Sequence, residues 1–153
     1  MIVVSDTSPL TALLTIGEAD LLRSLFDDVV IPEEVKAELL RGHPSLPLWI
    51  RVEPVKNTLE TARLYRLLDK GEAEAIELAK ELHAERLLMD ERKGRRVAAK
   101  EGVQVIGLLG IVLLAKRRGL IVSARSVVER LEKEAGVYLS SAIRNSALRT
   151  VTE

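Results

Sequence analysis

The stretch that decides the fold is GEAEAIELAKELHAERLLMDE, residues 71–91, which predicts a helix followed by a buried strand. Glu72 shares a helical face with Ala75 and Ile76, in the spacing of a side that packs inward. Glu74 lies on another side of the helix and is expected to face water. A glycine and an acid at a helix start are also ordinary start signals, so Glu72 fits a plain role at the positive end of the helix dipole.

Asp90 gives the same stretch a second interpretation. The short apolar run at residues 86–89 predicts a buried parallel strand, and a right-handed connection returns the chain to the edge where the helix began. Glu72 and Asp90 should then meet at the carboxyl edge of the sheet, where sites in open α/β folds form. The pair indicates a metal or acid–base role, but from this pair alone capping and solvation are the simpler interpretation.

Composition limits the classes of protein that the chain can belong to. It has 153 residues, of which 47% are hydrophobic and 30% charged, which is enough for one domain with a substantial core. Lys plus Arg and Asp plus Glu both number 23, so any surface for nucleic acid must be local. There is no cysteine, which excludes thiolate metal sites and is compatible with a cytoplasmic protein. Abundant charged residues beside sparse Asn and Gln are typical of thermophiles.

The hydrophobic stretches are too short or too interrupted for a membrane protein. The first ten residues lack a basic leader and include Asp6, so they do not form a signal peptide. The longest apolar stretch, residues 105–115, is too short to cross a bilayer. We therefore expect a cytoplasmic protein without a membrane partner.

Strand and helix patterns alternate along the chain, which predicts a three-layer α/β/α fold around a parallel sheet of four or more strands. The expected strands are residues 2–5, 29–31, 86–89 and 103–106. Residues 1–122 are expected to form the main domain. Residues 123–153 are expected to form a small helical extension that packs on it.

Several local features carry their own predictions. Residues 43–54 contain three prolines and are expected to be loop or short extended structure, with Trp49 in the core or in an interface. Residues 107–110 predict a tight connection into the next helix. In the extension, Ser126 and Ser140 are the expected helix caps.

Four acids are expected to gather at one edge of the sheet. Asp6 and Asp90 end strands, whereas Glu38 and Glu72 lie on helices that begin at the same edge. Asp6 taken alone could equally be a helix cap, and Glu38 alone a solvated residue. Carboxylates packed together either take up protons or bind a cation. Oxygen ligands without His or Cys favour Mg²⁺ or Mn²⁺.

Such an ion can polarise a phosphoryl oxygen and generate hydroxide for attack on a phosphodiester. Thr7 and Ser8, directly after Asp6, are candidates to hydrogen-bond the ligand or a bound water. Arg92 and Lys93, in the strongest basic cluster of the chain, are candidates to neutralise phosphate. A charge run of this kind is more often a solvated helix face.

Taken together, the motifs resemble those of the PIN-domain nucleases, which include the VapC-type toxins of prokaryotic toxin–antitoxin pairs. The resemblance spans roughly residues 1–122 and rests on the segments VVSDTSPL, VIPEEVKAELLRG, GEAEAIELA, LLMDERKGRRVA and VQVIGLLGIVLLAKRRGLI.

The resemblance implies a Mg²⁺- or Mn²⁺-dependent endoribonuclease that hydrolyses RNA. Asp6, Glu38, Glu72 and Asp90 match the four catalytic acids of the family, and Asp6, Glu72 and Asp90 match its metal ligands. Glu72 stands where many members have Asp, and its longer arm changes where an ion would lie. The resemblance also implies a homodimer and an antitoxin protein as partners.

Two other functions compete with this interpretation. The first is a PIN-like module that binds RNA or a protein but cuts nothing, against which the four intact acids argue. The second is a phosphatase in which Asp6 is the covalent nucleophile. Phosphatases of that type carry a second Asp two positions on, where this chain has Ser8.

Overall fold

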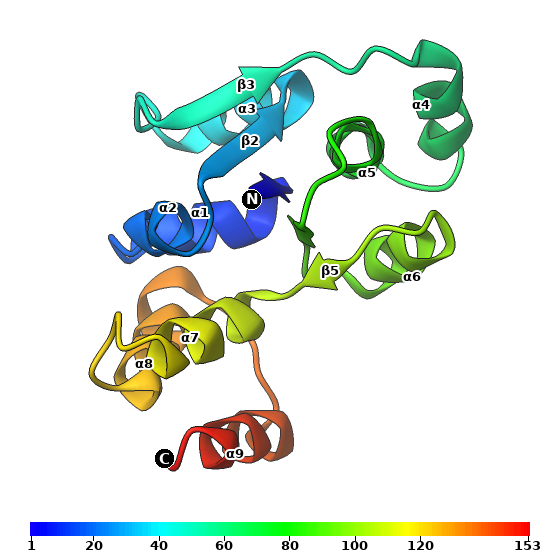
Figure 1. Cartoon of the computed structure of the whole chain (residues 1–153). Helices are drawn as coiled ribbons and strands as arrows, with labels where there is room; N and C mark the ends of the chain where they lie inside the picture. Colours follow the sequence, from blue (N-terminus) through cyan, green and yellow to red (C-terminus); the bar gives the residue numbers. More distant parts are fainter.

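A parallel sheet of five strands forms the centre of the molecule, in the order β3-β2-β1-β4-β5, with helices on both faces (Figure 1). The structure is a computed structural model that describes residues 1–153. The predicted three-layer α/β fold is therefore confirmed.

The elements follow one another as β1 (Ile2–Ser5), α1 (Thr7–Thr15), α2 (Asp20–Leu25), β2 (Asp28–Pro32), α3 (Glu33–Gly42), β3 (Ile50–Glu53), α4 (Thr58–Tyr65), α5 (Lys70–Glu81), β4 (Arg86–Leu88), α6 (Arg92–Lys100), β5 (Val105–Ile106), α7 (Leu108–Arg117), α8 (Ala124–Ala135) and α9 (Ser141–Thr150).

Strand β1 is the middle strand, and its side chains supply both hydrophobic cores. Val3 belongs to the larger core, with residues of α1, α2, α7 and α8, whereas Val4 belongs to the smaller one, with residues of α4 and α5. Successive side chains of a strand point to opposite faces, so a short apolar run such as β1 fills both layers. On one side β1 pairs with β2, and on the other Ser5 pairs with Leu88 of β4.

The C-terminal helices pack on the same face of the sheet as α1 and α7. Val128 and Leu131 of α8 are buried in the larger core, and α9 contributes Leu148. Ser140 caps α9 by accepting the Ile143 N–H at 3.2 Å, as predicted.

Several local predictions need correction. The predicted cap Ser126 is wrong, because α8 begins earlier and its Ser126 N–H donates to the side chain of the true cap, Ser123. Residues 107–110 are not a connection, since Gly107 caps α7 and the other three form its first turn. Within residues 43–54, expected to be loop or short extended structure, Ile50–Glu53 form the edge strand β3, which agrees with the extended alternative. No helix is long and apolar enough to cross a membrane.

Candidate functional site

Asp6 leaves the end of β1 and enters the first turn of α1. Its backbone N–H donates to the Leu88 carbonyl of β4 at 2.9 Å, which fixes the residue at the carboxyl edge of the sheet. The residue is only 5% exposed, and although it occupies the cap position of α1, its side chain makes no capping hydrogen bond. The sequence-based alternative of a plain helix cap therefore does not account for this carboxyl group.

The surroundings of Asp6 oppose its negative charge. Loss of hydration on burial is the main cause that raises the pKa of Asp6 to about 7, and the nearby Thr7 N–H offsets part of this effect. The charges of Asp69, Glu38 and Glu91 raise the pKa further. Asp6 is thus the centre of a cluster of acids that come from four separate segments of the chain.

Glu38 reaches the cluster from α3, as the sequence predicted. Its Oε2 atom accepts a hydrogen bond of 2.7 Å from the hydroxyl of Thr7, which directly follows Asp6. The side chain runs so close to the backbone of α5 that a Cβ atom added to Gly71 would overlap Glu38 Oε1. The absence of a side chain at Gly71 therefore allows Glu38 of α3 to pack directly against the backbone of α5 at the site.

Glu72 lies in the first turn of α5, which begins at Lys70 and not after Gly71. The Glu72 N–H donates to Asp69 Oδ1 at 2.8 Å, and the Asp69 N–H donates to Glu72 Oε1 at 3.3 Å, so the two acids form a capping box. Burial raises the pKa of Glu72 to about 7, and the charges of Asp69 and Asp6 act in the same direction. Glu72 therefore serves the helix start and belongs to the acid cluster at the same time.

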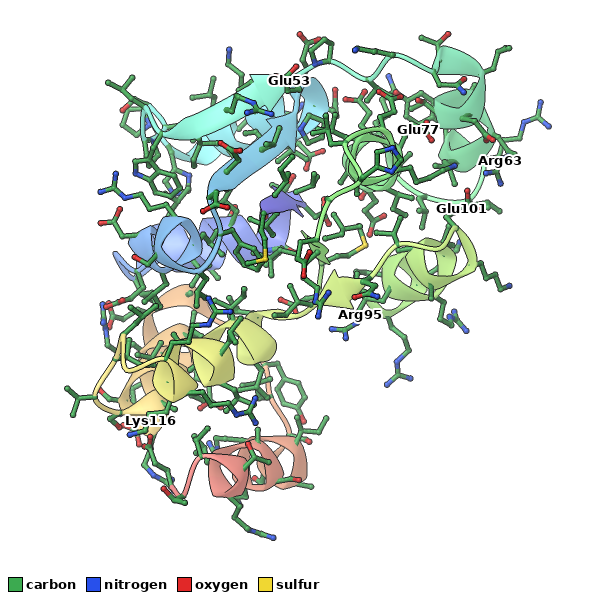
Figure 2. All side chains as sticks on the ribbon, in the orientation of Figure 1. Glu53, Arg63, Glu77, Arg95, Glu101 and Lys116 are labelled. Atoms are coloured by element: carbon green, nitrogen blue, oxygen red, sulfur yellow. The ribbon has the colours of Figure 1, made fainter.

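Asp90 follows β4, beside β1, but its carboxylate turns toward α7. Asp90 Oδ1 accepts the Leu108 N–H at 3.0 Å, and a Cβ atom on Gly107 would lie only 2.8 Å from the same oxygen. Loss of hydration raises the pKa of Asp90, whereas the Leu108 N–H and the positive charge of Arg95 lower it. Figure 2 shows Arg95 beside the connection between β5 and α7.

Sequence reasoning missed Asp69 and Glu91 as members of the cluster. Glu91 caps α6 by accepting the Gly94 N–H at 2.6 Å, which lowers the pKa of Glu91. A Cβ atom on Gly94 would lie 3.3 Å from Glu72 Oε2 and 3.5 Å from Glu91 Oε2, so both acids pack against one glycine. The capping pattern of an Asp followed three residues later by a Glu, at residues 69–72, was a signal that could have identified Asp69.

The prediction that Glu74 faces water is wrong. Glu74 accepts the Glu34 N–H at 3.1 Å and the hydroxyl of Tyr65 at 2.8 Å, which ties α3 and α4 to α5. Burial, together with the bond to Glu74, raises the pKa of Tyr65 to about 12. Glu74 is a structural residue at the junction of three helices.

The candidate substrate-binding residues surround the acids. Ser8 is exposed and its hydroxyl makes no hydrogen bond within the protein. Arg92 and Lys93 are exposed in the first turn of α6, directly after Glu91. Lys93 lines a cavity of about 380 Å³ together with Glu72 and Glu91. Positive groups therefore border the acid cluster on the side of α6.

The donor set suits a hard divalent cation, although no ready coordination site is formed. No three acid or histidine side chains converge closely enough in this structure to hold a metal ion. The donors are all carboxylate oxygens, which Mg²⁺ and Mn²⁺ prefer. Burial, together with neighbouring acids, raises the pKa values of Asp6 and Glu72, so a bound cation would favour their charged forms. The chemistry of the cluster therefore fits such an ion.

The fold and the acids define a class of α/β domains with a carboxylate site at the C-terminal edge of a parallel sheet. A family model described as PIN domain matches residues 2–153, and the chain belongs to this family. The match confirms the resemblance found in the sequence and continues through α8 and α9. PIN domains are typically nucleases, and PIN nucleases generally use divalent metals. No curated protein matches the chain significantly.

Proposed function

We propose that this protein is a ribonuclease that hydrolyses RNA phosphodiester bonds with Mg²⁺ or Mn²⁺. The observation that carries the proposal is Asp6, a buried carboxyl group without a capping role whose pKa is raised to about 7 among other acids. Buried negative charge without a counter-charge destabilises a fold, so its presence at a sheet edge is typical of a functional site.

In this proposal Asp6, Glu72 and Asp90 hold the ion, with Glu38 as the fourth acid. An ion held by these residues would supply Lewis-acid chemistry, polarising a phosphoryl oxygen and activating water for attack. The capping box positions Glu72 at the start of α5, and the Leu108 N–H holds the Asp90 carboxylate at its oxygen Oδ1. These backbone contacts fix where the carboxylates stand before any ligand arrives.

The neighbouring polar groups orient the RNA. Glu38 accepts the Thr7 hydroxyl proton in a hydrogen bond, which fixes Thr7 beside Asp6, while the hydroxyl of Ser8 is free to donate to a phosphate oxygen. Arg92 and Lys93 supply positive charge at the start of α6, where the negative backbone of RNA would lie. The chain has no net charge, so this local basic surface is what draws RNA to the acids.

A role as the toxin of a toxin–antitoxin pair, a cytoplasmic location and a homodimeric state are further parts of the proposal. The toxin role and the dimer are suggested by the PIN family, to which the chain belongs, whereas the location is suggested by the composition of the chain. Light scattering of the purified protein tests the dimer. A neighbouring gene for a small DNA-binding protein would support an antitoxin.

A PIN domain that binds RNA without cutting it is the alternative. The observation in its favour is that the carboxylates do not form a ready coordination site. A titration with Mn²⁺ separates the two functions, because a non-catalytic binder has no need of an ion at the cluster.

The proposed function is tested by incubating purified protein with single-stranded RNA in Mg²⁺ or Mn²⁺. We expect cleavage that EDTA stops and that Asp6→Asn abolishes, with the circular dichroism spectrum unchanged. Asp20→Asn is the matched control, because Asp20 is exposed and pairs only with Arg23. Cleavage that survives EDTA, or that persists in Asp6→Asn, would overturn the proposal.

A further inference from the structure

A cavity of about 650 Å³ opens beside the acid site and is lined by residues of α1, the start of α7 and the end of α8. Its polar side includes Thr7, Ser8 and Asp90, whereas most of its lining is apolar, as at Leu108. Small-molecule sites occupy about 300–1,000 Å³. The cavity has the size and mixed lining of a ligand site, and it shares its polar side with the proposed phosphodiester site.

Tyr138 stands at the wall of this cavity, in the segment between α8 and α9. It is one of only four aromatic residues in the chain, yet it is 88% exposed. Its hydroxyl makes no hydrogen bond within the protein, so neither burial nor hydrogen bonding gives the ring a role in the stability of the fold. Exposed aromatic rings are the platforms on which proteins stack unpaired bases of RNA.

We propose that this cavity is a nucleobase subsite, in which a base next to the scissile phosphate stacks on Tyr138. The inference rests on the proposed ribonuclease function and assigns that site its substrate contact. Thr7, Ser8 and Asp90 line the cavity, so an RNA whose phosphate was bound at the acids would have a flanking nucleoside near the mouth of the cavity.

The chemistry of the lining sets the kind of RNA that fits. An apolar cavity with few polar groups recognises the flat face of a base rather than its hydrogen-bonding edge. Only an unpaired base can leave the strand and enter a cavity, because a paired base is stacked within its helix. The subsite therefore fits the single-stranded or loop RNA that the family resemblance implies, and it tolerates more than one base at the position next to the scissile phosphate.

The test is a double-mutant cycle between the ring and the base. Once the cleavage position on a single-stranded RNA is mapped, analogues with an abasic residue on either side of that bond are compared with the intact RNA. One abasic analogue should raise the KM of the wild type about tenfold with little change in kcat, and Tyr138→Ala should raise KM about tenfold on intact RNA. Combining the two changes should add nothing further, because both remove one stacking contact.

Two variants control for the loss of the side chain. Tyr138→Phe keeps the ring and should behave as the wild type. Leu59→Ala removes another exposed apolar side chain, 84% exposed on α4 and away from the cavity, and should leave KM unchanged. An unchanged KM in Tyr138→Ala, or effects of ring and base that simply multiply, would overturn the subsite while leaving the ribonuclease intact. An altered oligomeric state of Tyr138→Ala with an unchanged KM would assign the ring to a protein interface.

The inference and the proposed function fail in different ways. If the wild type cleaves no RNA in Mg²⁺ or Mn²⁺, the ribonuclease proposal is wrong. Fluorescence anisotropy of a labelled single-stranded RNA then decides on the cavity. Weaker binding by Tyr138→Ala than by the wild type supports base stacking, and equal binding overturns it.

Discussion

The two ends of helix α5 hold carboxylates in opposite electrostatic surroundings. At its C-terminal end, Lys80 Nζ lies 2.9 Å from Glu101 and 3.3 Å from Glu77, and Arg63 lies 2.7 Å from Glu101. Figure 2 shows Arg63, Glu77 and Glu101 near one another. Arg63 and Lys80 lower the pKa of Glu101. The pKa of Glu77 is raised, because the effect of its burial is larger than that of the charge of Lys80.

At the N-terminal end of α5, Glu72 and Asp6 have pKa values raised to about 7, because burial and neighbouring acids act together. Glu101 at one end is thus matched by bases, whereas the pKa values of Asp6 and Glu72 at the other end are raised by burial and by neighbouring acids. Glu77 is intermediate, because its burial raises its pKa despite the contact with Lys80. Arg63 and Lys80 stabilise the charge of Glu101, whereas the charged forms of Asp6 and Glu72 destabilise the folded state. Such a difference within one helix indicates that the unmatched cluster exists for binding, not for stability.

The largest expected effect is on stability at alkaline pH. The pKa of Asp6 is above its ordinary value, so the folded state favours its protonated form. The free energy of unfolding is therefore highest below about pH 4 and falls as pH rises through about 7. Removing the charge with Asp6→Asn should therefore raise the free energy of unfolding at pH 8 by up to about 4 kcal/mol, with little change at pH 4. Urea unfolding at both pH values measures this. A variant that is less stable than the wild type at pH 8 would show that the charge is matched after all.

The next effect separates Glu72 from its role at the helix start. Gln at the third helical position also completes a capping box, so at pH 4, where the raised pKa leaves Glu72 uncharged in the folded protein, Glu72→Gln should keep its stability within about 0.5 kcal/mol. Loss of a metal-binding carboxylate should lower kcat about 100-fold. Cleavage rates and thermal unfolding measure the two effects. Full activity in Glu72→Gln would leave this residue only its capping role.

A third prediction uses the close approach of Gly71 to Glu38. An alanine Cβ at position 71 would overlap Glu38 Oε1 and displace the carboxylate from Thr7, so Gly71→Ala should lower kcat about tenfold. Gly42→Ala is the matched control, because a Cβ there meets nothing within 4 Å. Equal activities of the two variants in the RNA cleavage assay would show that the position of Glu38 does not matter.

The smallest effect is expected in the matched cluster. Glu101→Gln removes ion pairs to Arg63 and Lys80, so it should lower the free energy of unfolding by about 1 kcal/mol at pH 7 and leave kcat unchanged. The pKa of Glu101 is lowered, so its stabilisation is present above its ordinary pKa and lost as pH falls. Urea unfolding should therefore show a smaller difference at pH 3. A large fall in kcat would mean that this cluster, too, takes part in function.

The sequence predicted the elements that local patterns define. Short apolar runs located the strands, and Ala75 and Ile76 of α5 are buried as their spacing predicted. The helix also buries Ala73, Glu77 and Leu78, which lie outside the predicted face. The edge strand β3 was placed only as loop or extended structure, because its pairing with β2 depends on chain far away in the sequence. Local pattern sufficed where a residue's partners lie within one helical turn.

The candidate site was less predictable, because side-chain contacts there join distant segments. Asp90 turns to the Leu108 N–H, which only the folded connection from β5 to α7 brings near. Glu74 faces Glu34 and Tyr65 because both α3 and α4 pack against α5, and helical spacing within α5 does not reveal such neighbours. Asp69 and Glu91 were missed for a different reason. Each is the N-cap residue of a helix, and an acid at that position is already explained by capping.

Calorimetric titration with Mn²⁺ at pH 8 measures whether the acid cluster binds an ion, without any RNA. We expect the wild type and Glu101→Gln to bind Mn²⁺ alike and Asp6→Asn not to bind it. Near pH 7 the wild type should also release protons on binding, because Asp6 and Glu72 are partly protonated there. Equal binding by all three proteins, or no binding by the wild type, would show that the cluster is not a metal site.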